Sequence, residues 1–219
     1  MIQTLADIYA LPDDHEIKQA FLNKGIGSAY DEFCNRVEEF LLQGVQYLEK
    51  NKPKYRYLDE DTLTSILVFG LQQRDFQADH DNYCNGHCDL VVRSGNYEWY
   101  GEAKLDKGPG YVMEGFRQLC DRYAPGGPTT NRGGLIVYTG KRNKSKILDV
   151  WVKRIVRDYA DVSSVNLNGL CEETLTARTS HLHPATGLDF KVRHIPVSFY
   201  YKPTDRSARS ARSARSGGV

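Results

Sequence analysis

Apolar residues recur at helical spacing in the first third of the chain. Between Ser28 and Lys50 this spacing is kept by Phe33, Val37, Phe40, Leu41, Val45 and Leu48. Ser28 followed by Asp31 resembles an N-terminal cap, and Pro53 predicts that the helix ends near Lys50. The pattern therefore predicts one amphipathic helix over residues 28–50.

The segments on either side of this helix have different characters. Pro12, Gly25 and Gly27 interrupt residues 1–27, which predicts a helical or mixed N-terminal appendage. A second helix is expected to begin near Asp59, where three consecutive acids favour the positive end of a helix dipole. Its apolar side carries Leu63, Ile66, Leu67 and Leu71.

Strand and helix patterns alternate in the middle of the chain. Residues 89–92 predict a buried strand, a Ser-Gly-Asn turn follows, and residues 97–105 predict the returning strand. A helix over 111–123, a buried strand over 133–138 and an amphipathic helix over 147–156 come next. This alternation predicts a mixed α/β layer architecture.

The last third divides into a strand and a basic tail. Residues 192–201 predict a strand, and Pro196 indicates an edge position for it. After Asp205 the chain repeats Arg-Ser-Ala, which cannot bury a core and is expected to be disordered. We therefore divide the chain into a helical N-terminal region (1–54), a core (55–160), a C-terminal extension packed on that core (161–203) and a disordered basic tail (204–219).

Composition excludes several classes of protein. The 219 residues hold no run of 18 apolar residues and no N-terminal signal-peptide pattern, so a membrane or secreted protein is not expected. Five cysteines, an odd number, favour free thiols in a reducing compartment, and we expect a cytoplasmic protein. The net charge of +1 combines a tail with four arginines and a body that carries −3. Any binding of nucleic acid must therefore depend on a local site.

The candidate chemistry lies in the predicted hairpin. Asp89 is followed, after twelve residues, by Glu102-Ala103-Lys104. Residues two apart in a strand share a face, so Glu102 and Lys104 project together and the turn brings Asp89 beside them. Two carboxylates can hold Mg²⁺ with its waters, and a neighbouring lysine can orient or deprotonate water and stabilise phosphoryl charge. This set of groups suits phosphodiester hydrolysis.

The pattern resembles the PD-(D/E)XK nuclease superfamily over about residues 55–140. The resemblance implies a restriction-endonuclease-like fold, a mixed central sheet flanked by helices, with N- and C-terminal additions. It implies a Mg²⁺-dependent endonuclease, with Mn²⁺ as a substitute, that acts on DNA rather than RNA in a restriction or phage-defence setting. A homodimer or a defence-system partner protein is implied as well. It also places helical Glu60 at the metal or its waters and Gln118 near the scissile phosphate.

Two departures and several other interpretations accompany this resemblance. Cys88 stands where many relatives have proline, and four residues separate Gln118 from Tyr123 where some exonucleases of the family have three. Glu102 and Lys104 could instead form a surface ion pair, Asp89 a turn, and Gln118 a solvent-facing position. Asp59 or Asp61 could take the role of Glu60. The alternative function is a nuclease-fold module that holds nucleic acid or a partner protein without cleaving.

Other polar clusters indicate weaker candidates. A zinc site would use Cys84, His87 and Cys88 with His80, but four ligands within nine residues fit structural zinc poorly. His181 and His183 are expected to form a loop pair without a role. Tyr97, Trp99 and Tyr100 could stack bases or fill the core. The basic turn of Lys141, Arg142, Lys144 and Lys146 could hold a phosphate backbone or be a solvated loop.

Overall fold

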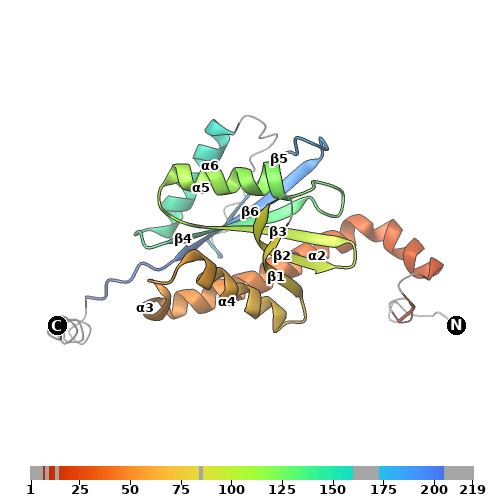
Figure 1. Ribbon diagram of the computed structural model, residues 1–219, viewed down its shortest axis with the longest axis horizontal. Helices are drawn as coiled ribbons and strands as arrows, with labels where there is room; N and C mark the ends of the chain where they lie inside the picture. The colour runs from red at the N-terminus through yellow and green to blue at the C-terminus, as the bar shows by residue number, and fades with distance from the viewer. Residues whose placement is uncertain (1–6, 8–9, 13–14, 84–85, 160–172, 205–219) are drawn as a thin grey trace.

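The computed structural model describes residues 7, 10–12, 15–83, 86–159 and 173–204. These residues form a six-stranded mixed sheet with helices on both faces (Figure 1). The strands are β1 (Gln77–Tyr83), β2 (His87–Ser94), β3 (Tyr97–Leu105), β4 (Arg132–Thr139), β5 (Ala177–Leu182) and β6 (Asp189–Ser198). The helices are α2 (Glu16–Lys50), α3 (Lys52–Tyr55), α4 (Glu60–Gln72), α5 (Pro109–Arg117), the π-helix η1 (Gln118–Tyr123) and α6 (Lys144–Asp158). The predicted α/β class is confirmed.

The strands lie in the order β1-β2-β3-β4-β6-β5. β1, β2 and β3 form an antiparallel meander, whereas β4 runs parallel to both β3 and β6, and β5 closes the far edge antiparallel to β6. Every residue of β4 is buried, as expected for a central strand with helices over both faces. β3 is therefore an interior strand, with β2 on one side and β4 on the other.

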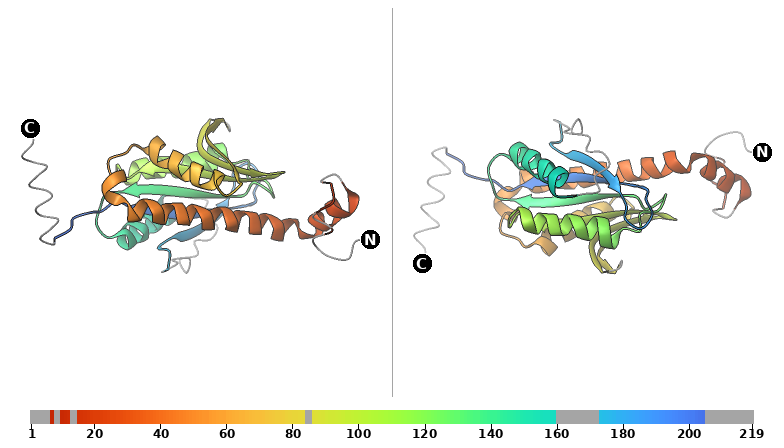
Figure 2. Two further views of the ribbon diagram at one scale, coloured as in Figure 1. Left: turned by 90° about the horizontal axis from the view of Figure 1, so that it is seen from below. Right: turned by 90° about the horizontal axis from the view of Figure 1, so that it is seen from above.

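Two helical layers cover the sheet (Figure 2). α2 and α4 pack on one face, where Trp99 is fully buried, and α5, η1 and α6 pack on the other, where Tyr100 is buried. Alternate residues of β3 point to opposite layers, so Glu102 and Lys104 share the α5 face with Tyr100. The N-terminal part of α2 extends past the end of the sheet.

The structure differs from the expected N-terminal organisation. The backbone of α2 is helical from Glu16 through Gly25 and Gly27, so Ser28 does not begin a helix and the expected break is wrong. Strand β1 was not expected, because its sequence QADHDNY has no apolar alternation. A half-exposed strand at the sheet edge tolerates such polar residues, since only one side of it is paired.

Pro196 does not mark an edge strand, because β6 lies between β4 and β5. The pairing with β5 ends at Ala177 opposite His194, two residues before Pro196. Ser198, two residues further on, donates its N–H to Glu49 Oε1 (2.7 Å). Because alternate N–H groups of a strand point to the same side, the nitrogen of Pro196 faces the same side of β6 as this bond. The N–H that proline lacks therefore falls where β6 has no neighbouring strand on that side.

A buried ion cluster joins α2 to the sheet. Glu38 is 2% exposed, and its Oε1 accepts from Arg132 Nη2 (2.8 Å). Its Oε2 accepts from Arg178 Nη2 (2.6 Å) and Arg193 Nη1 (3.0 Å). Asp31 also receives a bond from Arg132 (2.9 Å). One helical carboxylate thus binds guanidinium groups from β4, β5 and β6.

Several expectations concern parts of the chain outside the described residues. These are the basic tail from residue 205, residues 160–172 of the C-terminal extension, and Cys84. Among the helices that are described, none is long and apolar enough to cross a bilayer.

Candidate active site

The candidate site lies where β2 and β3 diverge. Their register runs from Ser94 opposite Tyr97 to Leu90 opposite Gly101. Beyond it, the N–H of Ala103 donates to Asp89 Oδ2 at 2.8 Å. Two residues further along β3, the N–H of Leu105 donates to Glu60 Oε2 at 2.5 Å. Two carboxylates thus replace the backbone acceptors that β2 no longer supplies, and these bonds fix their positions.

Lys104 lies at the centre of the site. Its Nζ is 2.5 Å from Glu102 Oε1, 3.5 Å from Glu60 Oε1 and 3.8 Å from Asp89 Oδ2. The lysine side chain is only 11% exposed. A surface ion pair on an edge strand would be largely exposed, so the interpretation of Glu102 and Lys104 as such a pair does not fit. The structure brings together four of the five residues that the sequence singles out.

Helix α4 selects Glu60 from three consecutive acids. Asp59 caps the helix, because its Oδ1 accepts from the N–H of Thr62 at 2.7 Å. Asp61 is exposed to solvent. Glu60 alone reaches across to the β3 backbone, so the capping residue and the site residue are different side chains.

Burial and like charge control protonation at Glu102. The Glu102 side chain is 1% exposed. Burial, assisted by the neighbouring Asp89 carboxylate, raises the pKa of Glu102 to about 8, although Lys104 opposes this shift. Burial alone would lower the pKa of Lys104, but the surrounding carboxylates, Glu102 foremost, raise it above its usual value. The ammonium is therefore charged at neutral pH, and the raised pKa of Glu102 means that a bound cation would compete with a proton for this carboxylate.

The arrangement of these carboxylates suits a small hard cation that keeps several waters better than a cation fully enclosed by protein ligands. No group of three or more His, Cys, Asp or Glu side chains in the described parts of the chain is arranged to enclose a metal ion. Yet Glu102 Oε2 is buried and accepts no hydrogen bond within the described structure, and Asp89 lies beside it. Mg²⁺ typically uses one or two carboxylates and keeps several waters. Asp89 and Glu102 fit that pattern, and Glu60 lies beside them through its contacts with Leu105 and Lys104.

Gly115 of α5 creates the space that Lys104 occupies. A Cβ atom at Gly115 would lie 2.6 Å from Lys104 Cγ and 2.9 Å from Cε. The lysine stem therefore runs directly over this glycine, and the helix holds the ammonium among the carboxylates. The sequence alone did not indicate this contact, because it depends on the packing of α5 on β3.

We expect Gly115→Ala to displace Lys104 and reduce activity more than it reduces stability. The added methyl group overlaps the flexible lysine stem, which can shift its ammonium away from Glu102. Gly110→Ala is the matched control, because it lies in the same helix and its Cβ would meet nothing within 4 Å. Cleavage rates and urea unfolding of both variants test this. Equal activity in the two variants would contradict the packing role.

A π-helix places Gln118 and Tyr123. η1 follows α5 directly, and the N–H of Ala124 bonds to Leu119 O, five residues back. A π-helical bond spans one residue more than an α-helical bond, so residues five apart share a face. Gln118 Oε1 is buried without a bond in the described structure, so the side chain is not simply solvent-facing. Burial raises the pKa of Tyr123, and the charges of Glu102 and Asp89 add to this shift.

The other polar candidates are dispersed. His87 is exposed and bonds to Asp81 (2.8 Å), whereas Cys88 is fully buried, so these two proposed zinc ligands point apart. His181 lies in β5 and His183 just after it, both buried, so the expected loop pair is wrong. Trp99 and Tyr100 are buried on opposite faces and Tyr97 packs against α2, so these rings belong to the core.

Two further side chains border the site. The ring of Tyr111 lies 5.8 Å from Lys104 Nζ and 4.9 Å from Lys107 Nζ. Asp106 follows β3 and binds Thr139 Oγ1 (2.8 Å) and Lys141 Nζ (2.6 Å). Sequence analysis missed both, although Asp106 lies two residues after the predicted lysine.

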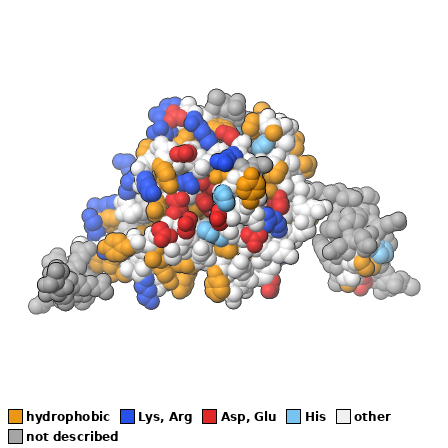
Figure 3. All heavy atoms as spheres, viewed as in Figure 1, with side chains coloured by type: hydrophobic (Ala, Val, Ile, Leu, Met, Phe, Trp, Pro, Cys, Tyr) orange, Lys and Arg blue, Asp and Glu red, His pale blue; other side chains and the backbone are white. Residues whose placement is uncertain are grey.

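Charged side chains of both signs lie on the face of the molecule shown in Figure 3. In the view of Figure 3, acidic side chains gather near the middle of the surface, and Lys and Arg side chains surround them, most densely on the left. An acidic centre with a cationic surround allows a polyanion to be held at its margins while a cation screens the centre.

Comparison of the chain with protein-family models, with curated proteins and with solved structures gave no match. The site is therefore interpreted from its own geometry.

Proposed function

We propose that this protein is a Mg²⁺-dependent nuclease with a restriction-endonuclease-like fold, related to the PD-(D/E)XK superfamily. The observation that carries the proposal is the convergence of Asp89, Glu102 and Lys104 where β2 and β3 diverge, with Glu60 entering from α4. The succession of an Asp-bearing strand, a turn, a Glu-x-Lys strand, a helix and a buried parallel strand supports the same fold.

Each residue has a distinct role in this proposal. Asp89 and Glu102 hold the metal, which when bound supplies an activated water and neutralises phosphoryl charge. Lys104 carries a positive charge, so it donates hydrogen bonds to the phosphoryl oxygens or to the attacking water and does not act as the base. Glu60 orients a water of the metal shell, and Gln118 contacts the substrate near the scissile phosphate.

The proposed substrate is DNA rather than RNA, cut internally in a restriction or phage-defence setting. A homodimer or a defence-system partner protein belongs to the same proposal. The extra residue between Gln118 and Tyr123 falls within η1, whose hydrogen bonds span five residues.

A panel of substrates and cations tests the proposed function. The full chain is incubated with supercoiled plasmid, single-stranded DNA and RNA, each with Mg²⁺, Mn²⁺ or EDTA. We expect conversion of plasmid to nicked and linear forms with Mg²⁺ or Mn²⁺ and none with EDTA. Metal-independent binding without cleavage of any substrate would contradict the proposal and favour the non-cleaving binding module.

The proton on Glu102 predicts how metal binding depends on pH. A proton and a metal ion compete for this carboxylate, so metal affinity should rise with pH up to about 8 and level off above it. Below that pH, affinity should change about tenfold per pH unit. Calorimetric titration with Mn²⁺ between pH 6.5 and 9 measures this. An affinity independent of pH would show that Glu102 is ionised throughout.

A further inference from the structure

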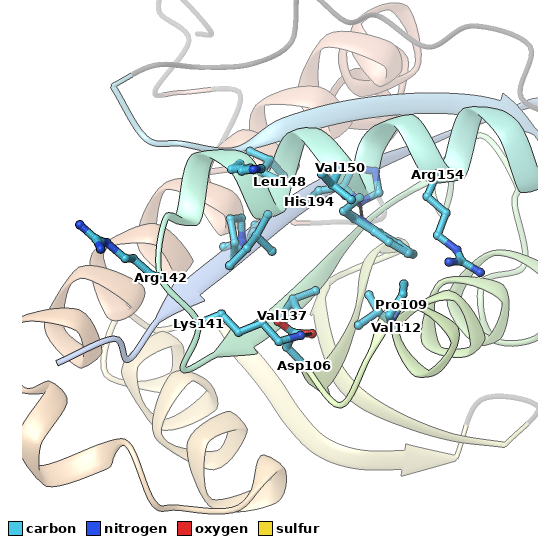
Figure 4. Close-up of a pocket in the computed structure, with 15 residues that line it drawn as sticks. Asp106, Pro109, Val112, Val137, Lys141, Arg142, Leu148, Val150, Arg154 and His194 are labelled. Atoms are coloured by element: carbon cyan, nitrogen blue, oxygen red, sulfur yellow. Dashed lines mark hydrogen bonds and ion pairs between the residues drawn. The ribbon is translucent and has the colours of Figure 1, made fainter. Parts of the chain in front are cut away.

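A second concave site lies between α5 and α6 on the same sheet face as the carboxylates (Figure 4). This α5–α6 pocket has a volume of about 300 Å³. Val137 of β4 and Pro196 of β6 form its floor, and Val112, Ile147 and Trp151 line its walls. Its size is at the lower end for small-molecule sites, and its interior is apolar.

The Trp151 indole lines this pocket, and its N–H already has a partner. Its N–H donates to His194 Nδ1 (3.2 Å), and His194 Nε2 bonds to Thr179 Oγ1 (2.8 Å). An indole N–H cannot accept, so His194 is the neutral tautomer with its proton on Nε2. Burial lowers the pKa of His194 to about 3, which keeps this arrangement through the physiological range. The indole ring is thereby fixed in the wall of the pocket.

Cations dominate the rim of the α5–α6 pocket. Lys141, Arg142, Lys146 and Arg154 line it. Lys141 is bound to Asp106 (2.6 Å) and Arg154 to Asp158 (3.0 Å), so Arg142 and Lys146 are the cations best placed to meet an anion. Arg142 and Arg154 lie at opposite ends of the pocket (Figure 4). An apolar slot with an aromatic wall and a positively charged rim is complementary to a flat apolar group that carries an anion.

The α5–α6 pocket also lies close to the carboxylate cluster. Val137, on its floor, is the register partner of Lys104, and neighbouring strands are about 4.8 Å apart. Asp106 comes two residues after Lys104, and Val112 comes one turn before Gly115 in α5. A strand held with one phosphate at Lys104 therefore has its adjoining nucleotides near this pocket.

We propose that the α5–α6 pocket receives one nucleotide of the bound nucleic-acid strand, with its base against Trp151 and its phosphate on the cationic rim. This inference rests on the proposed nuclease function and adds to it a preference for a strand whose base can leave the stack. Such a base is most easily supplied by a single strand, a mismatch or a strand end.

Anisotropy of a fluorescent single-stranded oligonucleotide tests the pocket, with the full chain in EDTA so that cleavage is not required. Ile147→Trp fills the pocket, and Lys146→Glu reverses one exposed rim charge. Lys54→Glu is the matched control, because it reverses an exposed lysine of α3 outside the pocket. We expect each pocket variant to weaken binding about tenfold and the control less than twofold. Wild-type affinity in Ile147→Trp together with equal effects of Lys146→Glu and Lys54→Glu would overturn the proposal.

Deoxyadenosine monophosphate as competitor distinguishes a strand from a free nucleotide. We expect it to compete only at concentrations far above those of the oligonucleotide, since it makes only the pocket contacts. Competition as effective as that of the oligonucleotide would overturn the strand assignment. The Mg²⁺ cleavage assay on the same variants separates the two proposals. Pocket-dependent binding without cleavage contradicts only the nuclease, and cleavage with an indifferent pocket contradicts only this inference.

Discussion

Lys104→Ala should lower the rate of Mg²⁺-dependent cleavage by about 10²–10³-fold, the range for removing one preorganised donor that stabilises charge in the transition state. Its ammonium lies within 3.8 Å of three carboxylates and is the cation that these residues hold in place. Without it, charge that develops on the phosphoryl oxygens has no protein counter-charge at this position. Single-turnover rates under saturating Mg²⁺ measure the loss.

Two companion variants make the Lys104 result specific. Lys104→Met keeps the apolar stem over Gly115 but lacks the ammonium, so its loss should match that of Lys104→Ala. Lys107→Ala removes a nearby exposed lysine that also approaches Tyr111, and it should retain activity. Full activity in Lys104→Met would show that the lysine serves packing and not chemistry.

Glu38→Ala should destabilise the fold by about 3–5 kcal/mol, the range for removing one partner of a buried ion pair. Glu38 is 2% exposed and accepts bonds from three arginines, and Arg132 is itself 5% exposed. The substitution would leave Arg132 buried and Arg193 largely buried near α2, with their main counter-charge removed. The free energy of unfolding from urea titration gives the effect.

The neighbouring acid supplies the control for this stability prediction. Glu39 is exposed on the same helix, and Glu39→Ala should change the free energy of unfolding by about 0.5 kcal/mol or less. The Glu38 cluster lies at the start of β4, whereas Val137, the partner of Lys104, lies near its end. The folded fraction of Glu38→Ala should therefore still cleave. A loss below about 1 kcal/mol would show that water reaches the guanidinium groups in the folded state.

The strands around the site were predictable because their patterns are local. The apolar run after Asp89, the turn and the alternation through Leu105 define the β2–β3 hairpin, and the period of two places Glu102 and Lys104 on one face. The family resemblance indicated Glu60, but the sequence left Asp59 and Asp61 open as alternatives, because capping geometry and the reach to Leu105 depend on how α4 packs. Its role remains a proposal, but its position is defined.

Other features depend on contacts that no local pattern encodes. Two glycines predict a break in α2, yet the backbone continues through them. The π-helix η1 brings residues five apart, such as Gln118 and Tyr123, toward one face of the helix. The α-helical periodicity of 3.6 does not predict this. Pro196 indicates an edge by its missing N–H, and the early end of β5 meets that requirement inside the sheet. Each of these differences arises from tertiary structure overriding a residue preference.

The central claim is that Asp89 and Glu102 hold a metal that cleaves nucleic acid with Lys104. The most direct measurement is the Mg²⁺-dependent cleavage rate of plasmid by the wild-type chain and by Asp89→Asn/Glu102→Gln, purified in parallel. The substitutions keep the shape of both side chains and remove their charge. We predict cleavage by the wild type, abolished by EDTA, and none above background by the double variant. Equal cleavage by the two preparations, or none by the wild type with Mg²⁺ or Mn²⁺ on any substrate, would contradict the claim.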